Sequence, residues 1–425
     1  MYDRGGEQSV KKILTLVFII IGVIWIWWHL EEDEVDATTE PIVEVVVPEI
    51  REETEETEET EEEAPLEIVD LEIESGFQEV SERFFYNQLD ERQQEIYRLL
   101  RAGLTRGDEE IQIDTDDAEE VHELFRFILF DHPELFWVTG TSSSRIYQWT
   151  DGTTYLIFKP EYGHTGAEKE AMQAEIDEAV EAFLASVDPA LSEYERVRAV
   201  YEHIILTTTY NLDAPDHQNI YSVFVNGESV CAGFSRAAQL LLNRLGIFAT
   251  YVVGDAYVPE ASSEPIAHAW NLVRIEGEYY YLDVTWGSPV FQDGNGLNHS
   301  GIVYDYLLVN EEKLFRTHTL AEGIVMPPVT SLRHNFFVMN GMFYESADEA
   351  RILESMNTSI RNQEDWVAFK FATPELFQTM RPIILEDLAG QAARNLAEWY
   401  ELERVQFFIR EKENLNKITI YWLYE

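Results

Sequence analysis

Apolar residues at the start of the globular part recur mainly at helical spacing. Residues 88–104 carry such a stripe behind a capping box formed by Asp90 and Gln93, which predicts a helix. A second stripe over residues 117–138 predicts another helix, which ends near Pro133 because proline cannot continue it. The ordered part of the chain is therefore expected to begin with helices.

The period changes to that of a strand over residues 144–162, where apolar and polar residues alternate around Asp151-Gly152. An Asp-Gly pair between two alternating runs is a strong signal for a β-hairpin. Helical spacing returns over about residues 167–185 and 192–207, so two further helices are expected.

The centre of the chain predicts one helix followed by three strands. The helix covers residues 231–245 and ends at Gly246, a residue type that commonly closes helices. A two-residue turn, Glu276-Gly277, joins the last two strands. The three strands cover residues 247–258, 266–275 and 278–286.

The C-terminal part has a similar mixture of patterns. We expect a hairpin-like element over residues 334–341, a long helix over about residues 386–402, and strands over residues 405–411 and 417–424. No internal period of roughly 20–50 residues occurs, which excludes a solenoid. The fold class is therefore α+β.

A single apolar segment precedes the globular part and is long enough to cross a membrane. Residues 13–30 are mostly apolar, and a helix of that length spans roughly 27 Å, close to the ~30 Å hydrocarbon core. Lys11 and Lys12 precede it, and no further Lys or Arg follows until Arg51. The positive-inside rule then predicts a cytoplasmic N-terminus and an extracytoplasmic bulk. A cleaved signal peptide is the alternative, but the sequence offers only a poor cleavage site.

Charge determines how the next segment is interpreted. The net charge is −50, and residues 31–65 hold 17 acidic residues and one base. Such a segment has little to bury and repels itself, so we expect an extended stalk. Binding of calcium or of a cationic cell wall is the alternative. Nucleic acid is excluded as a partner, because phosphate binding needs a basic surface.

The chain has one cysteine, Cys231, at the first position of the predicted central helix. One thiol cannot form an intrachain disulfide, so a disulfide scaffold is excluded. A lone cysteine is often a small buried apolar residue. A helix start, however, favours a thiolate and supplies backbone N–H groups that can stabilise an oxyanion. A nucleophile is therefore the second interpretation.

The register of the predicted hairpin brings a histidine and an aspartate together. A two-residue turn pairs Ile275 with Glu278. This register makes His268 and Asp283 diagonal neighbours on one face, about 7–8 Å apart at the backbone, a distance that their side chains can bridge. A three-residue turn would instead place the two side chains on opposite faces.

A thiol nucleophile needs a base, and the base needs an acceptor that fixes its tautomer. Cys231, His268 and Asp283 supply these three groups within one predicted helix-and-hairpin unit. A zinc site made of the same residues is the alternative, but a single soft ligand without a paired motif argues against it. We expect neither a metal nor a cofactor.

Several segments around these residues resemble the exported bacterial branch of the transglutaminase-like superfamily, a papain-related group. They are residues 225–247 (VNGESVCAGFSRAAQLLLNRLGI), 267–289 (AHAWNLVRIEGEYYYLDVTWGSP) and 304–312 (YDYLLVNEE). Residues 192–211 resemble the helix that precedes the nucleophile in that family. The resemblance covers about residues 189–310, and Phe234 stands where a tyrosine is common.

The resemblance implies a transglutaminase-like fold with Cys231 as nucleophile, His268 as base and then acid, and Asp283 as the orienting group. It also implies a thioester acyl-enzyme, made from an amide or peptide carbonyl and resolved by water or by an amine. The sequence leaves hydrolysis and transfer open. Candidates for the oxyanion site or the cleft are Tyr221, Asn226 and Trp270.

The sequence thus predicts a membrane-anchored, extracytoplasmic cysteine enzyme that acts on a protein or cell-wall peptide. The alternative is a non-catalytic surface-binding or scaffolding module with a residual triad. The expected parts are a cytoplasmic tail (1–12), a transmembrane anchor (13–30), an acidic stalk (31–65), an N-terminal accessory region of helices and a hairpin (66–165), a transglutaminase-like catalytic domain (166–330) and a C-terminal α+β accessory region (331–425).

Overall fold

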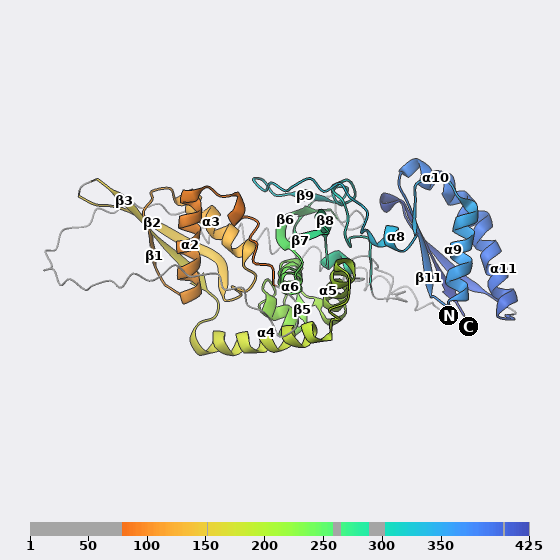
Figure 1. Cartoon of the computed structure of the whole chain (residues 1–425), viewed down its shortest axis with the longest axis horizontal. Coiled ribbons are helices and arrows are strands. Elements are labelled where there is room, and N and C mark those ends of the chain that lie inside the picture. The colour runs from red at the N-terminus through yellow and green to blue at the C-terminus, as the bar shows by residue number, and fades with distance from the viewer. Residues whose placement is uncertain (1–78, 151, 258–264, 289–301, 403, 425) are drawn as a thin grey trace, which may run out of the picture.

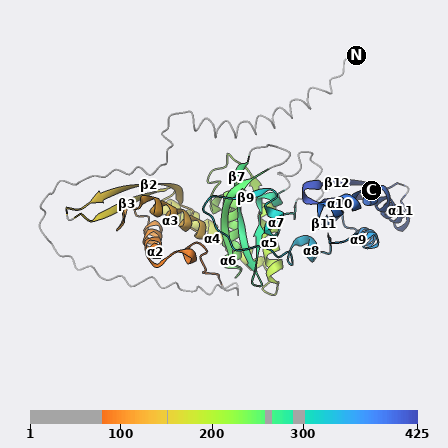
Figure 2. The same cartoon turned by 90° about the horizontal axis from the view of Figure 1, so that it is seen from above.

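The computed structural model describes residues 79–150, 152–257, 265–288, 302–402 and 404–424. They form three groups of elements in a row along the long axis (Figure 1), and a perpendicular view shows the same order (Figure 2). We call these groups the N-terminal unit (79–165), the central unit (166–330) and the C-terminal unit (331–424). The predicted anchor, 13–30, and stalk, 31–65, lie outside the described residues. Within the described ranges, no helix combines the length and apolar character needed to cross a bilayer.

The N-terminal unit packs two helices on a three-stranded antiparallel sheet with the order β1-β3-β2. Helix α2 (Glu91–Arg106) opens with the expected capping box between Asp90 and Gln93. Helix α3 (Ala118–Asp131) ends before Pro133, as predicted. The pairing of β2 with β3 confirms the predicted hairpin. The strands are β1 (Ile111–Ile113), β2 (Val138–Gln148) and β3 (Thr154–Tyr162).

The central unit contains an antiparallel sheet with the order β8-β7-β6-β9, and helix α6 packs against β6 and β7. The three predicted strands are observed, although the third ends at Leu282 and not at residue 286, and β9 is additional to them. The helices of the central unit are α4 (Gly166–Ser186), α5 (Glu193–Thr207), α6 (Cys231–Arg244) and the short α7 (Glu311–Leu314). The strands are β6 (Ala249–Ala256), β7 (Ile266–Ile275), β8 (Glu278–Leu282) and β9 (His318–Leu320).

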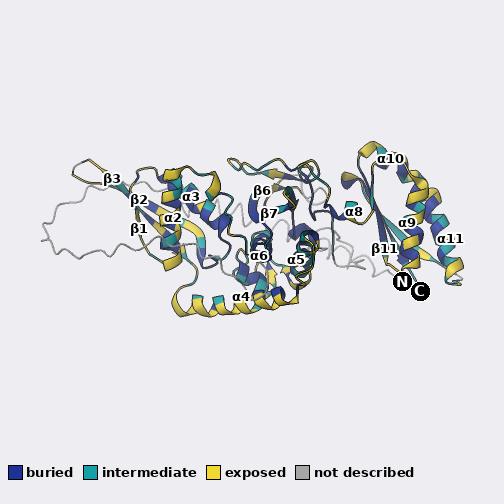
Figure 3. Ribbon diagram, in the orientation of Figure 1, coloured by how far each residue is buried: buried dark blue, intermediate teal, exposed yellow. Residues whose placement is uncertain are grey.

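One hydrophobic core runs through the N-terminal and central units and extends to Phe336, Phe337 and Ala368 of the C-terminal unit. It includes Phe125 of α3, Leu241 of α6 and Val273 of β7, each of which is almost fully buried. Burying a side chain of this size stabilises the fold by about 1.5–3 kcal/mol. Figure 3 shows this burial, because most of β6 and β7 in the central sheet is buried while the outer side of α4 is exposed.

The C-terminal unit has its own sheet, with the order β10-β11-β13-β12, and its own buried cluster beneath three helices. The strands predicted over 405–411 and 417–424 are confirmed. The helix predicted over about 386–402 is observed as a π-helical turn, Ile384–Leu388, followed by α11. The helices are α9 (Glu349–Arg361), α10 (Pro374–Ile383) and α11 (Ala389–Trp399). The strands are β10 (Phe343–Tyr344), β11 (Trp366–Phe371), β12 (Gln406–Lys412) and β13 (Lys417–Leu423).

The prediction of a hairpin-like element over residues 334–341 is wrong. Residues Phe336–Met339 form a short helix, α8, whose start is capped because the Asn335 side chain accepts a hydrogen bond from the Phe337 N–H. Gly341 has a positive φ of 70°, as a turn glycine should, but it leads into β10, which pairs in parallel with β11. Capping by Asn335 therefore outweighs the strand tendency of the apolar run.

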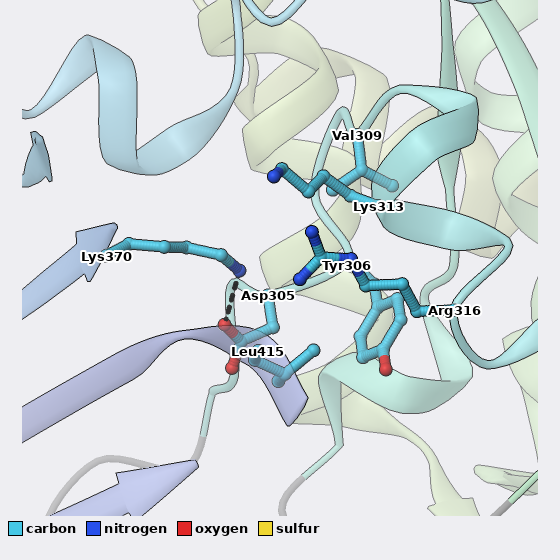
Figure 4. Close-up of a pocket in the computed structure, with 7 residues that line it drawn as sticks. All are labelled: Asp305, Tyr306, Val309, Lys313, Arg316, Lys370 and Leu415. Carbon is cyan, nitrogen blue, oxygen red and sulfur yellow. Dashed lines mark hydrogen bonds and ion pairs between the residues drawn. The ribbon is translucent and has the colours of Figure 1, made fainter. Parts of the chain in front are cut away.

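A buried ion cluster joins the central and C-terminal units. Asp305 is fully buried and pairs with Lys370 of β11 at 2.9 Å. It also pairs with Lys417 of β13. Figure 4 shows Lys370 reaching toward Asp305 in a small pocket that Tyr306 and Arg316 also line. Burial acts to raise the pKa of Asp305, but the two lysines outweigh burial and hold this pKa below its usual range.

The substitution Asp305→Asn should destabilise the protein, because it leaves two buried lysines without their counter-charge. We expect the free energy of unfolding to fall by about 3–5 kcal/mol, the range for breaking a buried ion pair. The control is Glu354→Gln, which removes an exposed pair with Arg361 and should cost less than about 1 kcal/mol. Urea denaturation followed by circular dichroism measures both, and equal losses in the two variants would contradict this account of the junction.

Candidate active site

Helix α6 places Cys231 at its first position. The strand before it, β5 (Glu228–Ser229), pairs in parallel with β4 (Thr209–Tyr210). The Val230 N–H then donates to the His217 carbonyl at 3.1 Å, which holds the residue before the helix in extended backbone. Val230 has no side-chain oxygen, so the first N–H groups of α6 have no side-chain cap. Cys231 itself is partly exposed.

A glycine allows the preceding loop to lie close to the start of α6. A Cβ atom at Gly233 would lie 2.0 Å from the Ser229 hydroxyl and 3.0 Å from the carbonyl oxygens of His217 and Asn219. The Ser229 hydroxyl is buried and donates to the His217 carbonyl at 2.8 Å. A side chain at Gly233 would therefore displace the loop. The glycine two positions after Cys231 is required by packing.

The hairpin formed by β7 and β8 brings His268 and Asp283 together. The pairing of Ile275 with Glu278 confirms the two-residue turn, and Asp283 follows the last residue of β8. His268 Nε2 lies 2.8 Å from Asp283 Oδ2, and the two side chains are 3% and 0% exposed. The second carboxylate oxygen of Asp283 accepts from the Trp286 N–H at 3.1 Å. The register predicted from the sequence thus produces a buried His–Asp hydrogen bond.

The surroundings of His268 favour its protonated ring. Burial acts to lower the pKa of His268, but the charge of Asp283, the hydrogen bond with that carboxylate and the interactions with Cys231 outweigh burial and raise this pKa to about 10. Burial acts to raise the pKa of Asp283, yet the His268 and His318 rings hold it below its usual range. Because Nε2 of His268 faces Asp283, Nδ1 is the ring nitrogen left for the hydrogen bond with the thiol.

A second histidine, His318 of β9, also contacts Asp283. Its Nε2 lies 3.1 Å from Asp283 Oδ2, and both side chains are fully buried. Burial is the main reason that the pKa of His318 is lowered. Sequence reasoning missed this residue because β9 has only 3 residues, too few for a pattern. Its pairing with β6 is also distant in the sequence.

Three of these groups have the chemistry of metal ligands. Atoms of His268, Asp283 and His318 that can ligate a metal lie within 4.8 Å of one another. The same atoms are already joined by hydrogen bonds, since Asp283 Oδ2 lies 2.8 Å from one ring and 3.1 Å from the other. A metal ion would have to replace these hydrogen bonds. Hydrogen bonding alone accounts for the observed arrangement.

The side chains predicted for the oxyanion site or the cleft are engaged elsewhere. The Tyr221 hydroxyl donates to Glu175 of α4 at 2.6 Å. Asn226 is exposed, and its amide donates to the Pro215 carbonyl at 3.5 Å. Trp270 is fully buried behind the His268 ring, at a centroid distance of 6.0 Å, because alternate residues of β7 point to the same face. A buried indole cannot line an open cleft, so that part of the prediction is wrong.

Tyr210 is a tyrosine that lies near the thiol. It pairs with Ser229 in the short β4–β5 ladder, two residues before Cys231. Burial raises the pKa of Tyr210, and the neighbouring Cys231 and Asp283 raise it further. The sequence signal was weak, because Tyr210 is separated from Cys231 by an irregular segment whose path the pattern does not specify.

Several solved structures resemble parts of this chain at low sequence identity. A TGase is 17% identical with a TM-score of 0.24, and the match covers 38% of this chain and 55% of that one. A presumed cysteine protease from Cytophaga hutchinsonii is 15% identical with a TM-score of 0.23, over 35% of this chain and 63% of that one. A presumed protease from Parabacteroides distasonis is 10% identical with a TM-score of 0.21, over 33% and 39%. This chain therefore spans less than two thirds of each neighbour, and such TM-scores support no further conclusion.

A comparison with protein families is more specific. A search of curated proteins finds no match. Residues 181–284, however, match the family described as the transglutaminase-like superfamily. The matched segment includes Cys231, His268 and Asp283 and ends before His318. The chain therefore carries a domain of the transglutaminase-like superfamily at residues 181–284.

Proposed function

We propose that this protein is a cysteine enzyme that attacks amide or peptide carbonyls through Cys231. The observation that carries the proposal is the buried 2.8 Å hydrogen bond between His268 Nε2 and Asp283 Oδ2, beside a thiol at the start of a helix. Nucleophile, base and orienting acceptor are the three parts that covalent acyl transfer needs. The family match over residues 181–284 supports the same class of chemistry.

The reaction would start from a thiolate and an imidazolium. Asp283 favours the protonated ring of His268, and the protonated ring stabilises the thiolate of Cys231. The thiolate attacks the carbonyl carbon, and the uncapped N–H groups of α6 donate to the developing oxyanion. His268 then gives its proton to the leaving amine as the C–N bond breaks, and a thioester on Cys231 remains.

The second half of the reaction releases the acyl group. The neutral ring of His268 takes a proton from water or from an acceptor amine, which attacks the thioester carbon. The C–S bond breaks, and the thiolate and the imidazolium are restored. Water gives a peptidase or amidase, and an amine gives an acyltransferase. Both outcomes use the same three side chains.

We place the substrate among proteins or wall peptides outside the cytoplasm. The basis is the apolar segment 13–30 with Lys11 and Lys12 before it, which has the length and flanks of a membrane anchor. The acidic segment 31–65 would then hold the enzyme away from the membrane. With 80 acidic and 30 basic residues, the chain repels polyanions and suits neutral or cationic peptides.

A non-catalytic binding module with a residual triad is the alternative. A binding module does not need the thiol and the His268 ring to lie close together. The contribution of Cys231 to the raised pKa of His268, which makes the two groups neighbours, and the partial exposure of the thiol count against it. A binding module would keep its cellular role in Cys231→Ala, whereas an enzyme would lose it.

Alkylation tests the nucleophile directly, because Cys231 is the only cysteine in the chain. At pH 6, iodoacetamide should modify the wild-type thiol about tenfold to a hundredfold faster than the thiol of His268→Gln, since glutamine cannot carry the charge that stabilises a thiolate. The control is His122→Gln, which changes a histidine of the N-terminal unit. The rates are measured by intact mass spectrometry. Equal rates in the wild type and in His268→Gln would refute the assignment.

The charged pair of His268 and Asp283 also predicts how the free energy of unfolding depends on pH. The pKa of His268 is raised from 6.5 to about 10, so its contribution is complete below about pH 6.5 and is lost as pH rises toward 10. The pKa of Asp283 is lowered from 3.8, so its contribution is complete above about pH 4 and is lost on acidification. Asp283→Asn removes both contributions.

The loss of unfolding free energy in Asp283→Asn should therefore be largest between about pH 4 and pH 6.5 and should shrink toward pH 10. Urea denaturation at pH 5.5 and pH 9.5 measures this difference. The control is Asp177→Asn on the exposed side of α4, for which we expect no such trend. A loss for Asp283→Asn that is equal at both pH values would show that the His268 ring is not charged in the folded protein.

A further inference from the structure

We propose that His318 is a positioning residue of this site, a neutral hydrogen-bond donor that fixes the Asp283 carboxylate in the orientation that the His268 ring needs. The inference rests on the proposed function. It extends that function beyond residues 181–284, because His318 lies outside the segment that matches the family.

The carboxylate of Asp283 is held by three donors. Oδ2 lies 2.8 Å from His268 Nε2 and 3.1 Å from His318 Nε2. Oδ1 accepts from the Trp286 N–H at 3.1 Å. With one hydrogen bond to each oxygen, the Asp283 carboxylate could still rotate about the line that joins the two donors. The third hydrogen bond, from His318, prevents this rotation. Without His318, the buried oxygen would keep only one of its two ring partners.

Polar groups also meet the other ring nitrogen of His318. Nδ1 lies 2.9 Å from the Thr317 hydroxyl, which lies 3.2 Å from the Tyr306 hydroxyl and 3.3 Å from the Leu314 carbonyl. An ionised carboxylate only accepts hydrogen bonds, so the proton of His318 that faces Asp283 sits on Nε2. In the neutral ring Nδ1 is then an acceptor, and the Thr317 hydroxyl, which also has the Leu314 carbonyl as an acceptor, is the donor that faces it.

Burial explains why the second ring stays neutral. The His318 side chain has no solvent exposure, and burial is the main cause that lowers its pKa. The neighbouring His268 ring opposes a second positive charge and lowers this pKa further. Three aromatic rings enclose His318, with centroid distances of 4.7 Å to Trp286, 5.1 Å to Trp270 and 5.5 Å to Tyr306. This enclosure excludes water and favours the neutral ring.

The sheet is built to bring His318 to this place. β9 pairs with β6, and His318 lies opposite Ala256. Gly254 of β6 lies opposite Leu320 in the same ladder. A Cβ atom at Gly254 would lie 1.9 Å from the Thr319 carbonyl oxygen, so only glycine allows β9 to come this close. If residue 318 only filled space, an apolar side chain would suffice there, and no hydrogen-bond donor would need to face Asp283.

The test compares His318→Phe with His318→Gln in the full chain. Phenylalanine keeps the ring but removes the donor, whereas the glutamine amide can donate from about the position of Nε2. Iodoacetamide alkylation of Cys231 at pH 6 should be about tenfold to a hundredfold slower in His318→Phe, the usual cost of losing the buried partner of a functional histidine. The rate in His318→Gln should stay within about threefold of the wild type. The midpoint of the pH–rate profile should rise in His318→Phe only.

Several outcomes would overturn the inference. A wild-type rate and pH midpoint in His318→Phe would show that the donor is not needed. Equal loss in His318→Phe and His318→Gln would show that packing alone matters. His268→Gln is measured in parallel: if it is slow while His318→Phe is fast, the proposed function stands and this inference fails. If neither is slow, the proposed function fails as well.

A second variant tests the inference even when His318→Phe does not fold. Thr317→Val is nearly isosteric and keeps His318, but it removes the hydroxyl that faces Nδ1. We expect alkylation at pH 6 to slow by about threefold to tenfold, with a higher pH midpoint, because Nδ1 loses the hydroxyl partner that supports donation from Nε2 to Asp283. An unchanged midpoint in a folded Thr317→Val would contradict this role of the Thr317 hydroxyl.

Discussion

The Asp283 carboxylate is the group on which the candidate site depends. It is a full negative charge without solvent exposure, and a protein tolerates such a charge only when it is paired and hydrogen-bonded. Its donors come from β7, from β9 and from the turn after β8. The hydrogen bonds of this one carboxylate therefore require three separate parts of the central unit to lie together. In that arrangement the His268 ring faces the start of α6.

Packing extends this constraint beyond the sheet. The rings of Trp286 and Tyr306 contact both each other and His318, so the aromatic wall of the site continues to the segment that contains Asp305. Asp305 in turn binds the lysines of the C-terminal unit. The C-terminal unit is thus tied to the residue next to Tyr306. A change in the junction can reach the site through one short piece of chain.

Local signals explain how much of this was predictable from the sequence. The turn at Glu276-Gly277 and the glycine after α6 predicted elements of the central unit, and the turn alone predicted the His268–Asp283 pair. His318 could not be predicted, because a 3-residue strand has no period and its position depends on the close approach at Gly254. The direction of the Tyr221 side chain could not be predicted either, because a tertiary contact with Glu175 decides it.

The central claim is that Cys231 accepts an acyl group with the help of His268. The most direct measurement mixes the full chain with an activated ester, quenches in acid within seconds and determines the intact mass. We expect a single acyl adduct on Cys231 that hydroxylamine removes, and that forms at least about tenfold more slowly in His268→Gln. Adduct formation at the same rate in both proteins would contradict it.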